Sequence, residues 1–183
     1  MIRLAKTAAK IDLNEVFKKR RILIRSLASK KSLSDIDVRE LLDTLAEWTG
    51  HRAVYRNLER NPRKKTLLGL RMLDDEGRNM YDRLTEIKDK ELLKGFRIPA
   101  TSVLLYWLRP EAYLPYNAKT KEFLRDSRMY HQGMSASSPA CYQTWLGFAE
   151  DLRARLQLPM IGHVDRLVTR HYDSKRGAQQ KHP

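Results

Sequence analysis

The sequence has few of the residues that disulfide-stabilised or membrane-spanning proteins need. It contains one cysteine, Cys141, so no disulfide forms within the chain and a reducing compartment is expected. No stretch approaches the roughly 18 apolar residues of a membrane-spanning helix, and the basic N-terminal segment lacks the apolar centre of a secretory signal. These absences predict a soluble, cytoplasmic protein with no membrane partner.

Motifs for cofactor and metal chemistry are also missing. The glycine-rich fingerprints of phosphate-binding and dinucleotide-binding loops do not occur among the 8 glycines. His163 and His171 are far apart on one helical segment, with Asp165 off their stripe, so they predict no metal centre. Cys141 has no neighbouring histidine that would activate a thiolate. We therefore expect neither a metal nor another cofactor.

Acidic residues are scarce relative to basic ones. The chain has 36 Lys and Arg against 22 Asp and Glu, which gives a formal net charge of +14 and a pI near 10.0. A positive field of this size attracts polyanions. Nucleic acid is therefore the first partner that the composition predicts, ahead of an anionic membrane surface.

Apolar residues recur at helical spacing along nearly the whole chain, and no segment has the alternation of a convincing strand. Two clear amphipathic patterns cover residues 13–31 and 34–48, and the full pattern predicts about eight or nine helices. A length of 183 residues fits one domain. We predict an all-α, compact multi-helix domain over residues 1–172, followed by a flexible polar tail over 173–183.

The segment KELLKGFRIPATSVLLYWL, residues 90–108, predicts a tight helical hairpin. Gly95 suits the left-handed end of a short first helix, and Pro99 suits the first turn of the second. The N–H groups that open the second helix, with Thr101 in its first turn, favour a phosphate beside Lys94 and Arg97. An ordinary hairpin in a helical bundle fits the same pattern.

This hairpin and the segment PEAYLPYNAKTKEFL resemble the helix-hairpin-helix core of the DNA glycosylase superfamily. In the ungapped match, the superfamily's aspartate falls on Asn117, the lysine of its lyase-type members on Pro99 and the second hairpin glycine on Arg97. An amide has no useful basicity and proline has no amine for a Schiff base. The resemblance therefore implies a glycosylase-like, DNA-binding fold without the standard catalytic groups.

A second resemblance is to helix-hairpin-helix-like domains of restriction and phage-defence proteins. It rests on LAEWTGHRAVYRNL, LLKGFRIPATSVLLYWLRPEAYLPYN and ACYQTWLGFAEDLRARLQLPMIGHVDRL in that order, over about residues 45–168. It implies a module that reads modified or distorted DNA in a restriction, defence or repair context. A small domain without an effector module suggests that a partner effector protein performs any cleavage, and we expect a cytoplasmic, nucleoid-associated location.

Other residues complete the predicted interface. Asn117 fits a helix N-cap and a contact to a base, and Tyr113 and Tyr116 fit the border of a cleft. The run KKRR over residues 18–21 fits a phosphate contact and a solvated helix face equally well. A dense basic cluster predicts a second phosphate anchor, formed by Arg56, Arg60, Arg63, Lys64 and Lys65.

The preferred interpretation is a DNA reader that contacts phosphates, with no catalytic residue assigned. One alternative is a DNA glycosylase for a modified base that uses another carboxylate, such as Glu111, Glu122 or Asp126. A further alternative is a helical module that binds RNA or another protein. The sequence does not decide among these three.

Overall fold

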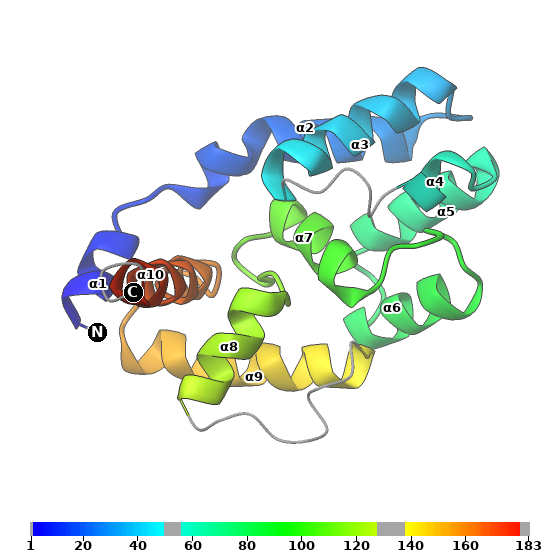
Figure 1. Ribbon diagram of the computed structural model, residues 1–183. Coiled ribbons are helices and arrows are strands. Elements are labelled where there is room, and N and C mark those ends of the chain that lie inside the picture. The colour runs from blue at the N-terminus through cyan, green and yellow to red at the C-terminus, as the bar shows by residue number, and fades with distance from the viewer. Residues whose placement is uncertain (1, 50–55, 128–137, 180–183) are drawn as a thin grey trace.

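The computed structural model describes residues 2–49, 56–127 and 138–179, and every regular element in these ranges is an α-helix (Figure 1). The all-α prediction is therefore confirmed, with one or two helices more than expected. The ten helices are α1 (Ile2–Ala8), α2 (Leu13–Ser29), α3 (Asp35–Thr49), α4 (Arg56–Glu59), α5 (Arg63–Asp74), α6 (Met80–Asp89), α7 (Ile98–Leu108), α8 (Ala118–Asp126), α9 (Pro139–Arg155) and α10 (His163–Gln179).

Helix α7 is the centre of the core, and α2 and α5 pack against it. Every residue from Ala100 to Leu108 is buried, as expected for a helix that is apolar on all sides. Its hydroxyl groups are hydrogen-bonded: Thr101 donates to the Arg97 carbonyl and Ser102 to the Pro99 carbonyl. These two hydroxyl groups are therefore satisfied, whereas the buried Trp107 Nε1 has no hydrogen-bond partner within the described residues.

Aromatic rings fill the space between α2, α3 and α7. The Phe17 ring centroid lies 4.7 Å from that of Tyr106 and 5.4 Å from that of Trp48, both edge-on. Trp48 meets Trp107 at 6.0 Å. Such edge-to-face pairs add roughly 0.5–1.5 kcal/mol each beyond the burial of area. Tyr106 and Trp107 belong to the core, because neither ring is exposed.

Side-chain caps fix the starts of several helices where the sequence predicts them. The Ser34 hydroxyl accepts a hydrogen bond from the Asp37 amide, and the Asp37 carboxylate accepts one from the Ser34 amide at 2.8 Å. Lys30 donates to the same carboxylate at 2.6 Å. The hydrogen bond from Lys30, followed by that from the Ser34 amide, lowers the pKa of Asp37.

Helix α10 packs against α8 and α9, and Gly162, just before α10, is bonded to the C-terminal end of α7 and the segment that follows it. The Gly162 amide donates to the Pro110 carbonyl at 2.8 Å, and the Tyr106 hydroxyl donates to the Gly162 carbonyl at 3.1 Å. A Cβ at this position would lie 2.5 Å from the Pro110 oxygen, so only glycine fits.

Helix α10 continues to Gln179, so residues 173–179 are helical where the sequence predicts a flexible tail. Ion pairs hold this part of the helix against α8. Lys175 bonds the Asp126 carboxylate at 3.0 Å and lies 3.3 Å from Glu122, and Lys119 lies 3.8 Å from Asp173. These contacts between distant segments are not visible in the local composition of the tail.

The connection between α6 and α7 is a series of turns, and the short helix predicted before Gly95 does not form. Helix α6 ends in a Schellman motif: the Glu91 amide donates to the Lys88 carbonyl and the Leu92 amide to the Ile87 carbonyl. Glu91 takes the left-handed conformation, with φ of 48°. A second turn follows, in which Gly95 has φ of +82° and the Phe96 amide bonds the Leu93 carbonyl.

We expect the substitution Gly95→Ala to destabilise the protein by about 2 kcal/mol. An alanine would be strained at a φ of +82°, and its Cβ would lie 2.6 Å from the Cβ of Asn57. Urea unfolding followed by circular dichroism measures the change.

The matched control is Gly147→Ala, because Gly147 lies inside α9 with no atom near its Cβ position. There, alanine should stabilise the protein by about 0.5–1 kcal/mol. Equal effects of the two substitutions would contradict the turn geometry.

Candidate functional site

Two chain segments that carry predicted contact residues lie side by side: the α4–α5 junction and the turns between α6 and α7. The buried Asn61 side chain joins them, donating to the Leu92 carbonyl at 2.7 Å and to the Thr66 hydroxyl. Gly95 lies against Asn57, and Lys65 donates to the Lys90 carbonyl at 3.2 Å. We call the surface of these two segments the junction face.

The junction face carries exposed cations that have no carboxylate partner within the described residues. The Lys65 side chain donates a hydrogen bond only to a backbone carbonyl. The side chains of Arg60, Lys64, Lys94 and Arg97 make no hydrogen bond or ion pair within the described residues. Two of these cations lie in the first turn of α5, which has no acid, so the helix dipole opposes them. Cations placed against a dipole and left unpaired favour an anionic partner. The set is Arg60, Lys64, Lys65, Lys94 and Arg97.

Three predicted contact residues do not fit this face as expected. Arg63 is held within the chain: its Nη2 lies 2.7 Å from the Asp35 carboxylate and its Nη1 bonds the Glu59 carbonyl. Thr101 is 2% exposed, with its hydroxyl donated to a backbone carbonyl. The side chain of Arg56 lies outside the described residues. Arg63 and Thr101 therefore stabilise the fold in this structure.

Asn117 caps helix α8, as one of the two interpretations predicted. Its Oδ1 accepts a hydrogen bond from the Thr120 amide at 3.2 Å. The preceding amide, that of Tyr116, donates to the Ser102 hydroxyl at 2.9 Å, so α7 fixes the position of the cap. The contact of Asn117 with a base stays a prediction.

The two tyrosines expected at a cleft differ in exposure. The Tyr116 ring has no exposed area and packs against Tyr142, so the prediction that it borders a cleft is wrong. Tyr113 is half-buried, and its hydroxyl accepts a hydrogen bond from Arg83 at 2.6 Å. Arg83 is itself buried and also donates to the Leu73 carbonyl. The sequence around Arg83 has the pattern of an ordinary solvent-exposed helix and does not indicate that this arginine is buried and hydrogen-bonded.

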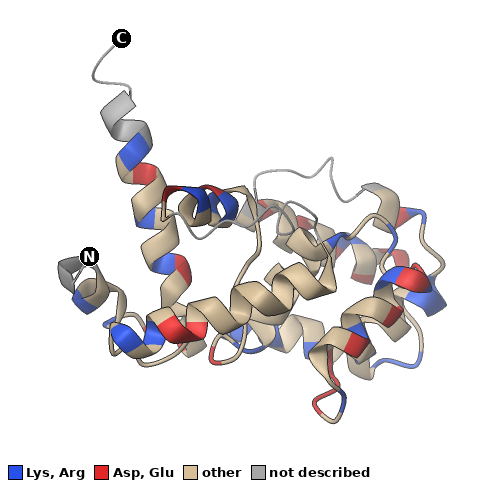
Figure 2. Cartoon of the chain, turned by 90° about the horizontal axis from the view of Figure 1, so that it is seen from below, with Lys and Arg blue, Asp and Glu red and all other residues tan. Residues whose placement is uncertain are grey.

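Two cavities open at the junction face. One, of about 480 Å³, lies where α6 meets the start of α7, and Lys88 and Arg97 stand beside its apolar residues. The other, of about 680 Å³, is a shallow groove between the start of α5 and the turns after α6, where Lys64 and Lys65 face Glu91. Acidic residues thus interrupt the positive surface, and Figure 2 shows both signs of charge spread over most helices.

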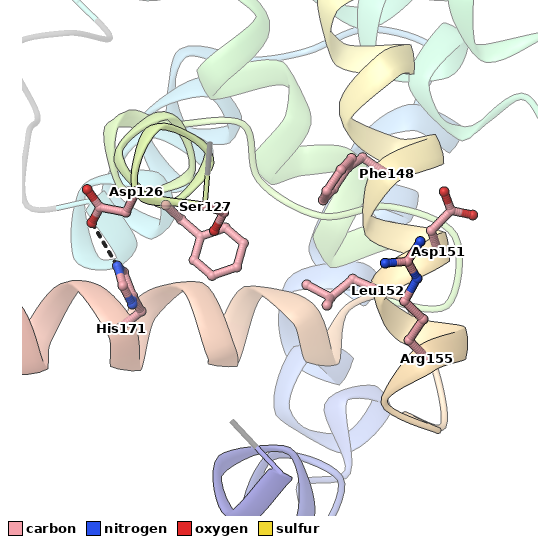
Figure 3. Close-up of a pocket in the computed structure, with 8 residues that line it drawn as sticks. Asp126, Ser127, Phe148, Asp151, Leu152, Arg155 and His171 are labelled. Atoms are coloured by element: carbon pink, nitrogen blue, oxygen red, sulfur yellow. Dashed lines mark hydrogen bonds and ion pairs between the residues drawn. The ribbon is translucent and has the colours of Figure 1, made fainter. Parts of the chain in front are cut away.

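A third cavity, of about 500 Å³, lies between α8, α9 and α10 (Figure 3). Phe123, Phe148 and Leu152 form its apolar part, and the His171 ring bonds the Asp126 carboxylate at 2.8 Å beside it. The hydrogen bonds from His171 and then Lys175 lower the pKa of Asp126. Asp126 is therefore an ion-paired carboxylate and lacks the raised pKa of a general acid.

His163, His171 and Asp165, whose spacing predicts no metal centre, do not form a group of metal ligands in the structure. His163 is buried, with Nε2 2.9 Å from the Ile11 carbonyl and Nδ1 3.3 Å from that of Met160. No cluster of three or more potential ligands occurs in the described parts of the chain. Nor does any helix in those parts combine the length and apolarity needed to cross a membrane.

Asp165, in the first turn of α10, is a buried carboxylate that makes no hydrogen bond or ion pair to a side chain within the described residues. Burial raises its pKa to about 6, although the nearby charges of Arg166 and Lys119 act in the opposite direction. The sequence identifies Asp165 only as a helix residue, because its burial depends on packing between distant helices.

Comparisons of the chain with protein-family models, with curated proteins and with solved structures found no match.

We expect Asp165→Asn to stabilise the protein at pH 7.5 by up to about 3 kcal/mol. The folded protein holds this proton up to a pKa of about 6, whereas the unfolded chain releases it near 3.8. Stability of the native protein therefore falls as pH rises between these values, and the variant should not show that fall.

Chemical unfolding at several pH values tests this expectation. The gain should disappear below pH 3.8, where Asp165 is neutral in both states. Asp151→Asn, at an exposed site, should change stability by less than about 0.5 kcal/mol at every pH. A gain for Asp165→Asn that does not vary with pH would contradict the burial argument.

Proposed function

We propose that the protein binds DNA through the phosphate backbone, using the junction face. The observation that carries the proposal is the group of exposed cations, without a carboxylate partner among the described residues, that two separate chain segments place next to each other. Because the net charge is +14, the long-range field also favours a polyanion. Contacts of this kind position a protein on nucleic acid without reading base sequence.

In this proposal the segment from α6 to α7 acts as the helix-hairpin-helix element. Gly95 allows the turn to approach α4, and Pro99 lies in the first turn of α7. A phosphate at this end of α7 meets the positive end of the helix dipole. Lys94 and Arg97, both exposed, lie on the turn that precedes the helix.

Asn117 is the proposed contact for a modified or distorted base. Its oxygen is used by the cap, but its Nδ2 has no partner within the described residues. The side chain is half-buried, so it is accessible to a partner from one side. A reader of this kind, associated with the nucleoid, would depend on a partner effector protein for any cleavage in a defence or repair system.

The glycosylase alternative is weaker for two of the carboxylates named above. Asp126 and Glu122 both pair with Lys175, and this leaves them poorly suited to protonate a base. Glu111 is exposed and lies beyond the end of α7. The experiment below still tests for base release, and it separates DNA from RNA.

The proposal is tested with labelled duplexes that carry unmodified, methylated, hydroxymethylated or deaminated bases. Fluorescence anisotropy measures binding, alkali treatment of the same samples measures released bases, and unlabelled RNA serves as competitor. Binding without alkali-labile strands supports the reader. Base release would establish the glycosylase, and competition by RNA that DNA cannot match would establish an RNA-binding module.

We expect the affinity for duplex DNA to fall steeply with salt, with a slope set by the cations of the junction face. The pairs Lys64→Gln with Lys65→Gln, and Lys94→Gln with Arg97→Gln, should each flatten the slope of log K against log salt by about 2.

Lys6→Gln with Lys10→Gln is the matched control, because it removes the same charge from exposed positions at the α1 end of the chain. This pair should leave the slope within about 0.5 of the native value. Equal flattening by all three pairs would show that net charge, and not the junction face, determines binding.

A further inference from the structure

Helices α2 and α3 lie next to each other (Figure 1). Side chains of these two helices line a groove. The groove has a volume of about 660 Å³. Val16, Lys19 and Leu23 follow one another along its α2 wall at helical spacing, and Glu40 and Glu47 do so along its α3 wall.

This pair of helices exposes an unusual amount of apolar surface. Ile22 is 60% exposed and Val16 39% exposed on α2, and Ile36 is 76% exposed on α3. Elsewhere in the described residues only Leu68 and Tyr81 are large hydrophobic residues of comparable exposure. A concentration of apolar side chains at the edge of a groove is typical of an interaction surface.

The two walls carry opposite charges that do not pair with each other. Lys19 and Arg20 on α2, and Glu40 and Glu47 on α3, make no ion pair within the described residues. The Arg20 guanidinium is held in place by the rings of Trp48 and Trp107, 5.3 and 5.4 Å away. The α2 wall therefore presents a basic edge in which Arg20 is held in place, and the α3 wall presents an acidic edge.

Helix α3 is acidic in a chain that is otherwise strongly basic. Its sequence, DIDVRELLDTLAEWT, has five acids and one base. A surface with this charge repels nucleic acid, so this face is separate from the DNA surface proposed above. The basic residues beside it on α2 equally argue against a uniformly basic partner.

A face with one basic edge and one acidic edge is complementary to itself under a two-fold rotation. The rotation places α2 of one copy on α3 of the other, and the same contact forms twice. We infer that the α2–α3 face is the interface of a two-fold dimer of this chain. The inference does not depend on DNA binding.

The size of the face sets the expected strength of the dimer. Helices of 17 and 15 residues are about 25 and 22 Å long. Two such helices offer less than the roughly 800 Å² per partner of a standard interface. We therefore expect a dissociation constant of about 1–100 µM.

Charge reversal on one wall at a time tests the dimer. The variants are Lys18→Glu with Lys19→Glu on α2, and Glu40→Lys with Glu47→Lys on α3, all at exposed or half-buried positions. Each variant alone should weaken dimerisation at least about tenfold, because like charges then face each other. Sedimentation equilibrium measures the constants, and circular dichroism verifies folding.

An equimolar mixture of the two variants decides the geometry. In a mixed dimer both contacts again join opposite charges, so the mixture should recover the native constant to within about threefold. Lys6→Glu with Lys10→Glu, in and beside α1, is the control and should leave the native constant unchanged.

Three results would overturn the inference: a native protein that stays monomeric at about 1 mM, a dimer that neither reversal weakens, or a mixture that does not recover. The second would place the interface on another face. Binding of a different protein to this face without self-association would show that the occupant is not a second copy.

Discussion

Burial of α7 on all sides is the constraint on which the rest of the structure depends. A helix from Ile98 to Leu108 that has no polar face must be covered everywhere, so α2, α5 and the aromatic cluster around Tyr106 surround it. Its hydroxyl groups also bond the surrounding chain, since Ser102 accepts a hydrogen bond from the Tyr116 amide and Tyr106 donates one to the Gly162 carbonyl. The C-terminal end lies beside Gly162, whose amide donates a hydrogen bond to the Pro110 carbonyl just after the helix, and the other end emerges at the turn that carries Lys94 and Arg97.

The charge of the chain is divided among its faces. Acids gather on α3, while the start of α5 and the turns after α6 keep cations that no carboxylate neutralises within the described residues. Cations in the first turn of α5 cost stability, because they oppose the helix dipole and repel one another. Cations that stabilise the fold have a carboxylate partner instead. Arg63 and Lys30 each bond a carboxylate of α3, at 2.7 and 2.6 Å. The contrast separates cations used within the fold from those available to a partner.

Much of the fold followed from local patterns in the sequence, because helices depend on short-range spacing and caps. The Asn117 cap and the helix that begins beside Pro99 were both predicted from neighbouring residues. The candidate site was predicted less well, because contacts between residues far apart in the sequence determine which of its side chains are paired or buried. Arg63 looks like Lys64 in the sequence, but only Arg63 meets Asp35, which is 28 positions away. Burial likewise separates Tyr116 from Tyr113, and packing between α8 and α10 extends α10 into the predicted tail.

The two proposed surfaces are linked through the salt dependence of binding. The five cations of one junction face, which have no carboxylate partner in the described parts of the chain, limit the slope of log K against log salt to about −4.5, because each phosphate contact contributes about −0.9. Two copies joined through α2 and α3 would present two such faces to one duplex and double this limit. The second face also binds at a high effective concentration, so a dimer that is weak alone becomes populated on DNA. Since reversal of Glu40 and Glu47 leaves the junction face intact, a steeper slope that this variant abolishes would belong to the dimer and not to additional phosphate contacts of one chain.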